Sequence, residues 1–167
     1  MMRSLDELIP ILKSAVQTRT GHSGGLLLPD WDEDDWRRLL AGARVVELGP
    51  GDLLLRRDEP SNDLYFLVDG ELEISVTQSS SQSLTAPIRV GPGSVVGEIA
   101  FFDGGPRTAS VWSRGPSVVL RLPEAEFRAW RAAEPERAGD LLFALARLLA
   151  IRLRRYSGAG RRDAAQY

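Results

Sequence analysis

The segment VGEIAFFDGGPRTASV, residues 96–111, interrupts an otherwise even series of short strands. A strand ends at Gly97, a short apolar turn begins at Glu98, and residues 103–106 reverse the chain into Arg107 and another strand. Gly97 has no Cβ, so a ligand can approach the backbone closely at this point. A turn that begins near Glu98 presents free backbone N–H groups and the positive end of a dipole, which favours an anion.

Two charged side chains give this segment a more specific chemistry. Arg107 has a planar guanidinium that can form charge-assisted hydrogen bonds with phosphate oxygens. Glu98 supplies a carboxylate that accepts a hydrogen bond from a sugar hydroxyl. A fixed cation, a fixed acceptor and a row of amides suit a phosphorylated sugar better than a simple anion. The residues alone leave a second interpretation equally open, in which Glu98 and Arg107 form an ion pair that braces a hairpin.

Short apolar runs on both sides of this segment predict a β-rich region from Arg44 to Leu122. The runs alternate with turn signals that are rich in glycine, proline and aspartate. These signals are Gly49–Asp52, Asp58–Asp63, Asp69-Gly70, Gly91–Gly93 and Gly115-Pro116. Many short strands at even spacing are typical of an antiparallel barrel, roll or sandwich. Residues 78–87 are polar and predict a hairpin loop.

Helical periodicity precedes the strands. Apolar residues recur at helical spacing in residues 1–18, where Pro10 predicts that the helix is kinked or begins near that proline. Residues 20–25 form a flexible linker by composition and contain His22, the only histidine. Residues 29–41 predict a helix whose acidic first turn and later arginines complement the helix dipole.

Helical periodicity returns after the strands. One helix is predicted over residues 123–133, and Pro135 opens a second that runs to about Tyr156. The second helix has an apolar stripe within residues 141–151 and a basic end. Residues 157–167 are rich in glycine, alanine and arginine, and we expect them to be disordered.

The composition fits one ordinary globular domain with short extensions. The chain has 167 residues, of which 43% are hydrophobic and 26% are charged, so disorder throughout is excluded. The net charge of −2 argues against a global electrostatic surface for nucleic acid. Residues 111–167 nevertheless hold 11 arginines and 6 acids, which gives that part a charge of +5. An acidic partner or a nucleic acid at the basic end therefore stays an open alternative.

Several chemistries are excluded by the inventory of residues. Without cysteine the chain forms no disulfide, thiolate metal site or cysteine nucleophile. A single histidine ahead of the strands does not supply the metal ligands of a cupin-type enzyme or a phosphodiesterase. We therefore expect no enzyme, no catalytic residue and no metal site. No apolar run is long enough to span a bilayer, and Asp6 and Glu7 interrupt any signal-peptide core, so we expect a soluble, cytoplasmic protein.

The segment at 96–111 resembles the phosphate-binding cassette of the cyclic nucleotide-binding domain family. The resemblance rests on Gly97-Glu-Ile-Ala100, six intervening residues and Arg107-Thr-Ala-Ser-Val111. This family includes the catabolite activator proteins and the regulatory subunits of protein kinase A. Membership implies a mainly β fold, an eight-stranded antiparallel β-roll (jelly-roll-like) with N-terminal helices and two C-terminal helices. We expect a helical arm and linker at 1–28, the binding domain at 29–156 and a disordered tail at 157–167.

The resemblance also implies a role for each residue of the cassette. Glu98 matches the acid that binds the ribose 2′-hydroxyl, and Arg107 matches the cation that neutralises the cyclic phosphate. Backbone amides complete the phosphate site, and a hydroxyl at Thr108 permits cGMP, although cAMP is slightly favoured. The expected ligand-binding set is Gly97, Glu98, Ile99, Ala100, Arg107, Thr108 and Ala109. No cofactor is expected, because the ligand is cAMP or cGMP.

The family resemblance implies a non-enzymatic receptor that regulates a protein partner. Ligand binding would reposition the C-terminal helices, of which the last covers the base or pairs two subunits. Arg152, Arg155 and Tyr156 are the residues that we consider as contacts to the base. Residues 157–167 are too few for a helix-turn-helix module, so we expect no direct sequence-specific DNA binding. The alternative is an interaction module that keeps the fold without binding a nucleotide.

Overall fold

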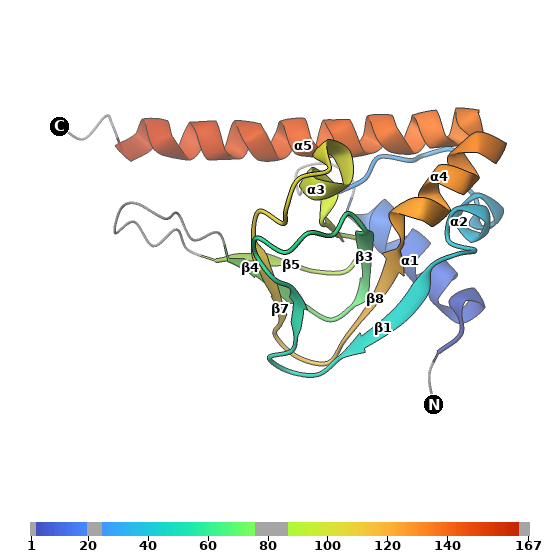
Figure 1. Ribbon diagram of the computed structural model, residues 1–167, viewed down its shortest axis with the longest axis horizontal. Coiled ribbons are helices and arrows are strands. Elements are labelled where there is room, and N and C mark those ends of the chain that lie inside the picture. The colour runs from blue at the N-terminus through green and yellow to red at the C-terminus, as the bar shows by residue number, and fades with distance from the viewer. Residues whose placement is uncertain (1–2, 20–24, 76–86, 164–167) are drawn as a thin grey trace.

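The computed structural model describes residues 3–19, 25–75 and 87–163, with side chains placed as far as Arg155. Within these residues, eight strands form two antiparallel sheets of four strands each (Figure 1). The strands are β1 (Arg44–Leu48), β2 (Leu53–Leu55), β3 (Leu64–Asp69), β4 (Leu72–Ser75), β5 (Ile88–Val90), β6 (Val95–Val96), β7 (Ser110–Ser113) and β8 (Ser117–Leu122). Their order is β1-β8-β3-β6 in one sheet and β2-β7-β4-β5 in the other. The predicted eight-stranded β-roll is therefore confirmed.

Strand β3 separates two hydrophobic cores. Leu64, Phe66 and Val68 pack in the core that the helices share, whereas Tyr65 and Leu67 pack in the interior of the roll. This division follows from the period of two along a strand, which sends successive side chains to opposite faces. A strand with both faces covered has a continuous apolar sequence, and β3 has one because helices cover the face that points away from the roll.

Four helices build the second core against the β1-β8-β3-β6 sheet. They are α1 (Leu5–Thr18), α2 (Glu33–Leu39), α4 (Glu124–Ala133) and α5 (Pro135–Asp163). A fifth, short helix, α3 (Glu98–Asp103), follows β6 directly. Figure 1 shows α3 between the long helix α5 and the β-roll, so the predicted cassette lies where the two parts of the fold meet.

Helix α1 begins at Leu5 and contains Pro10, so of the two predicted alternatives, a kink at Pro10 or a start near it, the start near Pro10 is wrong. Ser4 is its N-cap: the Ser4 side chain accepts from the backbone N–H of Glu7, and the Glu7 carboxylate accepts from the backbone N–H of Ser4. This capping box starts the helix before the proline, and the buried face offsets the hydrogen bond that the proline lacks. The buried residues of that face are Leu8, Ile9, Leu12 and Val16. The N-terminal helix is thus packed into the same core as α2, α4 and α5.

Two other helix boundaries differ from the prediction. Helix α2 begins at Glu33, because Asp32 forms a capping box with Asp35 that starts the helix four residues later than expected from the pattern at 29–41. Helix α5 continues to Asp163, beyond the end predicted near Tyr156 and into the segment expected to be disordered. No proline stops it, and the glycines in this stretch each cost only about 1 kcal/mol in a helix.

Two predicted loops fall largely outside the residues that the structure describes. His22 and residues 78–86 of the predicted hairpin loop lie outside the described residues. Among the helices that the structure describes, none combines the length and the apolar character that a membrane crossing requires. Helix α5 has the length, but arginines interrupt its apolar stretch.

Candidate functional site

Gly97 joins β6 to α3 in a conformation that favours glycine. Its φ is +86°, in the left-handed region, and a Cβ at this position would lie 2.6 Å from Nη1 of Arg107 and 3.0 Å from the carbonyl oxygen of Asp63. The sequence predicted that a ligand approaches Gly97. In the structure, the group that approaches Gly97 is the Arg107 guanidinium, so the glycine makes room for the arginine.

Arg107 is a buried cation held by neutral oxygen atoms. The residue is 2% exposed, and its guanidinium donates to Ser61 Oγ (2.8 Å), the Gly97 carbonyl (3.0 Å) and the Asp63 carbonyl (2.9 Å). The ring of Tyr65 lies 5.6 Å from the guanidinium carbon. Burial lowers the pKa of Arg107 and raises the pKa of the Tyr65 hydroxyl. The guanidinium nevertheless remains charged, because arginine does not lose its proton in proteins.

No carboxylate of the described residues forms an ion pair with Arg107. The brace between Glu98 and Arg107, which the sequence left open, is therefore not formed within the described part of the chain. Burying a charge without a counter-ion is costly, even where neutral groups satisfy some of its donors. An anion that reached this guanidinium would therefore be strongly favoured.

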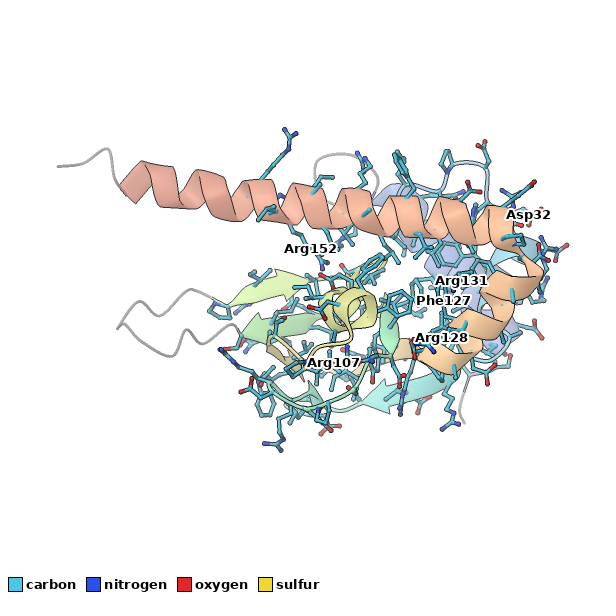
Figure 2. The ribbon with its side chains drawn as sticks, turned by 45° about the horizontal axis from the view of Figure 1, so that its top comes forward. Asp32, Arg107, Phe127, Arg128, Arg131 and Arg152 are labelled. Carbon is cyan, nitrogen blue, oxygen red and sulfur yellow. The ribbon has the colours of Figure 1, made fainter. Side chains whose placement is uncertain are left out.

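Glu98 pairs with an arginine from the far end of the chain. Its carboxylate oxygen Oε1 accepts from Nη1 of Arg152, and Nη2 of Arg152 donates to the Val95 carbonyl at 2.8 Å. Glu98 is 6% exposed. Figure 2 shows Arg152 on the side of α5 that faces α3 and the roll. Arg152 was one of three candidate contacts to the base, whereas in the structure it contacts the carboxylate of the cassette.

A cavity of about 890 Å³ lies between the cassette, strands β4 and β5, and helix α5. All seven predicted ligand-binding residues line it: Gly97, Glu98, Ile99, Ala100, Arg107, Thr108 and Ala109. Apolar side chains form the opposite wall, namely Ile74, Ile88 and Val90 from the sheet and Leu149 and Leu153 from α5. A cavity of this size with an apolar wall and a few convergent polar groups is typical of a small-molecule site.

The charged residues around this cavity are mostly basic. Its lining contains five arginines and one acid: Arg19, Arg89, Arg107, Arg152, Arg155 and Glu98. Arg19 comes from the end of α1 and donates to the Pro92 carbonyl at 3.2 Å. Burial lowers the pKa of Arg19, and the charge of Arg152 lowers it further. The lining favours an anionic ligand, and helix α1 contributes to it although residues 1–28 gave no such signal.

Two groups of contacts connect the cassette to helix α4. The rings of Phe101 in α3 and Phe127 in α4 pack edge to face with centroids 4.9 Å apart (Figure 2 labels Phe127). Asp63, whose carbonyl holds Arg107, also accepts from the backbone N–H of Glu124 at 3.1 Å through its carboxylate and pairs with Arg121. Both contacts join residues that are far apart in the sequence, so the sequence pattern did not predict them. It identified residues 58–63 only as a turn.

The comparisons with known proteins agree with this fold. The chain matches the family model of the cyclic nucleotide-binding domain over residues 45–134, which is more than half of its length. The chain therefore belongs to the cyclic nucleotide-binding domain family.

The similar proteins include transcriptional regulators and a solved binding domain. A CRP-like cAMP-activated global transcriptional regulator from Mycobacterium tuberculosis is 31% identical over 110 residues, which cover 66% of this chain and 47% of the regulator. The chain thus corresponds to less than half of that protein. A cyclic nucleotide-binding domain from Methylobacillus flagellatus has a TM-score of 0.74 at 22% identity. The match covers 90% of this chain and 80% of the Methylobacillus chain. The N-terminal domain of a Streptomyces coelicolor transcriptional regulator has a TM-score of 0.59 at 30% identity, with coverage of 78% and 89%.

Proposed function

We propose that this chain is a non-enzymatic receptor domain for a 3′,5′-cyclic nucleotide, with cAMP as the first candidate and cGMP as the second. The observation that carries the proposal is the buried Arg107 guanidinium, which lines the cavity and has no carboxylate counter-ion within ion-pair distance among the described residues. The cyclic phosphate supplies that counter-ion. The backbone amides of Ile99, Ala100 and Ala109 complete the phosphate site, and Glu98 accepts a hydrogen bond from the ribose 2′-hydroxyl.

The choice of base rests on Thr108 and on one similar protein. Thr108 is an exposed residue on the cavity wall, and its hydroxyl can bind either the phosphate or the amino group of guanine. The regulator from Mycobacterium tuberculosis is described as cAMP-activated. We therefore place cAMP first, and cGMP stays compatible with Thr108.

The proposal is tested by the thermal stability of the purified chain with and without ligand. Cyclic nucleotide at 100 times its dissociation constant should stabilise the fold by about 2.7 kcal/mol, which for a chain of this size raises the melting temperature by roughly 5–10 °C. The noncyclic 5′-AMP is the matched control and should raise it less. An unchanged melting temperature with cAMP and cGMP would favour the alternative, an interaction module that keeps the fold without binding a nucleotide.

Ligand binding is proposed to act on the C-terminal helices through α3. A nucleotide that binds the cassette contacts α3 and Arg107 together, and both are connected to α4 by the Phe101–Phe127 and Asp63–Glu124 contacts. A signal requires that the nucleotide bind one arrangement of α4 and α5 better than another. Trp130 in α4 packs against Phe127 with centroids 5.9 Å apart and provides a spectroscopic probe of that helix.

Replacing Phe101 with alanine should leave the binding of cAMP intact but weaken the rearrangement of α4 that binding causes. Phe101 is only partly buried and is absent from the cavity lining, so we expect the affinity for cAMP to change by less than about threefold. The change in tryptophan fluorescence on adding cAMP should fall to less than about half of the wild-type change, because the aromatic contact to α4 is lost. Phe102→Ala is the control, since Phe102 is exposed and its ring packs on Phe101 but not on α4. A full fluorescence change in Phe101→Ala would rule out this route.

Helix α5 is proposed to pair with α5 of a second copy. Its exposed face carries Phe143, Ala146, Ala150 and Leu153, with Phe143 77% and Leu153 67% accessible, and Ala150 and Leu153 also line the edge of the cavity. The spacing of three, four and three residues is that of a coiled-coil seam, in which a large apolar residue at each end flanks two alanines. A different protein partner on this face is the competing outcome.

Phe143→Glu is expected to convert a dimer into a monomer. The exposed position leaves the fold intact, whereas two carboxylates in one seam repel each other and lose the buried rings. Light scattering after gel filtration should give twice the chain mass of 18.4 kDa for the wild type and the single mass for the variant. A wild-type chain that remains monomeric at high micromolar concentration, with or without cAMP, would refute pairing through α5.

A further inference from the structure

A second cavity, of about 570 Å³, lies beside the segment 60–63 that holds Arg107. Its walls come from the tip of the cassette at residues 104–106, the start of α4 at residues 123–125, and two arginines of the sheet, Arg44 and Arg121. Among the described residues, its lining has no member in common with that of the first cavity. The second cavity is large enough for a small molecule and is a site of its own.

The two arginines of this cavity are direct neighbours across the sheet. Arg44 of β1 and Arg121 of β8 are partners in the antiparallel ladder, where like charges opposite each other are destabilising. The Arg121 guanidinium is paired with the Asp63 carboxylate, which accepts from its Nε at 2.6 Å. Arg44 is exposed and forms neither an ion pair nor a hydrogen bond through its side chain within the described residues. An anion beside Arg44 would pair with it and would reduce its repulsion from Arg121.

The rest of the lining restricts the kind of anion. Its two acids already have cations, since Asp63 pairs with Arg121 and Oε1 of Glu124 lies 2.5 Å from Nε of Arg128. Both carboxylates nevertheless remain in the wall, so they repel a dianion such as phosphate more than a monoanion. Rigid or small apolar residues form much of the remaining wall, namely Pro60, Pro106, Pro123 and Ala125. The lining therefore favours a monoanion with an apolar body.

Two polar side chains of the lining have donors to spare. Ser61 Oγ accepts from Nε of Arg107 at 2.8 Å, and its hydroxyl hydrogen has no acceptor in the described part of the chain. Asn62 is half-buried, and its side-chain amide forms no hydrogen bond with any described residue. A hydroxyl and an amide can both donate to a carboxylate. Ser61 and Asn62 thus add two neutral donors to the charge of Arg44.

We propose that the second cavity binds a small monocarboxylate, which pairs with Arg44, accepts from Ser61 and Asn62, and packs its apolar body on the prolines. This ligand is different from the cyclic nucleotide, and its site does not depend on the proposed function. Ser61 belongs to the second cavity and also holds Arg107. Because hydrogen bonds in a chain polarise one another, an acceptor for the Ser61 hydroxyl strengthens its bond with Arg107. We therefore expect the carboxylate to tighten the binding of cAMP, a coupling that does rest on the proposed function.

The site is tested without any nucleotide, by the amide chemical shifts of the wild-type chain. Sodium hexanoate is the probe, and the signals of Gly104, Gly105 and Ala125 report on two walls of the cavity. We expect these shifts to change saturably, with a dissociation constant of about 10 mM or tighter for so small a ligand. Sodium chloride at the same concentration and 1-hexanol, which has the chain without the charge, should not reproduce the change. Sodium phosphate should bind more weakly than hexanoate.

Two exposed arginines provide a matched pair of variants. Arg44→Ala should weaken the binding of hexanoate by about fivefold and leave the fold intact, because Arg44 is exposed and has no partner among the described residues. Arg131→Ala removes an exposed arginine of α4 outside both cavities and should bind hexanoate as the wild type does (Figure 2 labels Arg131). No saturable shift at about 100 mM hexanoate, or equal affinities of the two variants, would overturn the site. Tighter binding of phosphate than of hexanoate would overturn the assignment of a monocarboxylate.

The coupling between the two sites is tested by calorimetric titration with cAMP. Saturating sodium hexanoate should tighten the binding of cAMP at least about twofold relative to the same concentration of sodium chloride, and by reciprocity cAMP should tighten hexanoate binding equally. Ser61→Ala removes the shared hydroxyl, so this difference should vanish in that variant. Equal affinities for cAMP in the two salts would overturn the coupling. Failure of the wild-type chain to bind cAMP at all would refute the proposed function, whereas the chemical-shift titration decides the carboxylate site on its own.

Discussion

Arg107→Ala is expected to weaken the binding of cAMP by at least about 100-fold, or roughly 2.7 kcal/mol. The guanidinium is buried, it donates to three neutral oxygen atoms, and the cyclic phosphate would be its counter-ion. Removing it leaves the phosphate in a partly closed cavity without its nearest cation, and charge-assisted hydrogen bonds are lost together with the Coulomb attraction. The dissociation constant from calorimetric titration measures the effect.

Two further variants separate this effect from general changes in charge and stability. Arg107→Lys keeps a positive charge but not the planar fork, so its affinity should lie between those of the wild type and the alanine variant. Arg114→Ala removes an arginine that pairs with Glu73 outside the cavity lining, and its affinity should equal that of the wild type. An Arg107→Ala protein that is folded and binds cAMP as tightly as the wild type would remove the basis of the phosphate site.

Gly97→Ala should damage both the stability of the fold and the affinity for the ligand. Its left-handed conformation costs a residue with a Cβ about 1–2 kcal/mol, and the new atom would lie 2.6 Å from Nη1 of Arg107. The new Cβ would also lie 3.0 Å from the Asp63 carbonyl oxygen, which is part of the backbone and moves less easily than a side chain. The Arg107 guanidinium is therefore the group that must shift. We expect a melting temperature lower by roughly 5–10 °C and an affinity for cAMP lower by at least about tenfold.

Gly51→Ala is the matched control for the glycine substitution. Gly51 has almost the same φ, +83°, but no atom lies within 4 Å of the position of its Cβ, and it lies in the turn between β1 and β2. Its alanine variant should lose stability from the backbone conformation alone and should bind cAMP normally. Equal affinities for the two alanine variants would show that the space between Gly97 and Arg107 does not matter for binding.

The β-roll and the cassette side of the cavity could be predicted because their signals are local. Apolar runs separated by glycine, proline and aspartate indicate strands and turns within a few residues, and the seven predicted cassette residues lie within one stretch, 97–109. The apolar run at Leu64–Val68 was identified as a strand, and the structure places its side chains in both cores.

The contacts that hold the charged groups of the site could not be predicted in this way. Ser61 and Asp63 contact Arg107 across 46 and 44 residues of sequence, and Arg152 contacts Glu98 across 54. Such pairs depend on how distant elements pack, and no spacing within the sequence encodes them. The alternative that α1 begins near Pro10 was wrong for a related reason, because the burial of its apolar face outweighs the local cost of Pro10.

Calorimetric titration of the wild-type chain with cAMP and with cGMP tests the central claim most directly. We predict that at least one of the two binds at one molecule per chain with micromolar or tighter affinity, and the ratio of the two affinities determines the base preference that Thr108 leaves open. No heat with either nucleotide, together with an unchanged melting temperature at millimolar ligand, would contradict the claim. The chain would then be a β-roll whose buried arginine serves a purpose other than binding a cyclic phosphate.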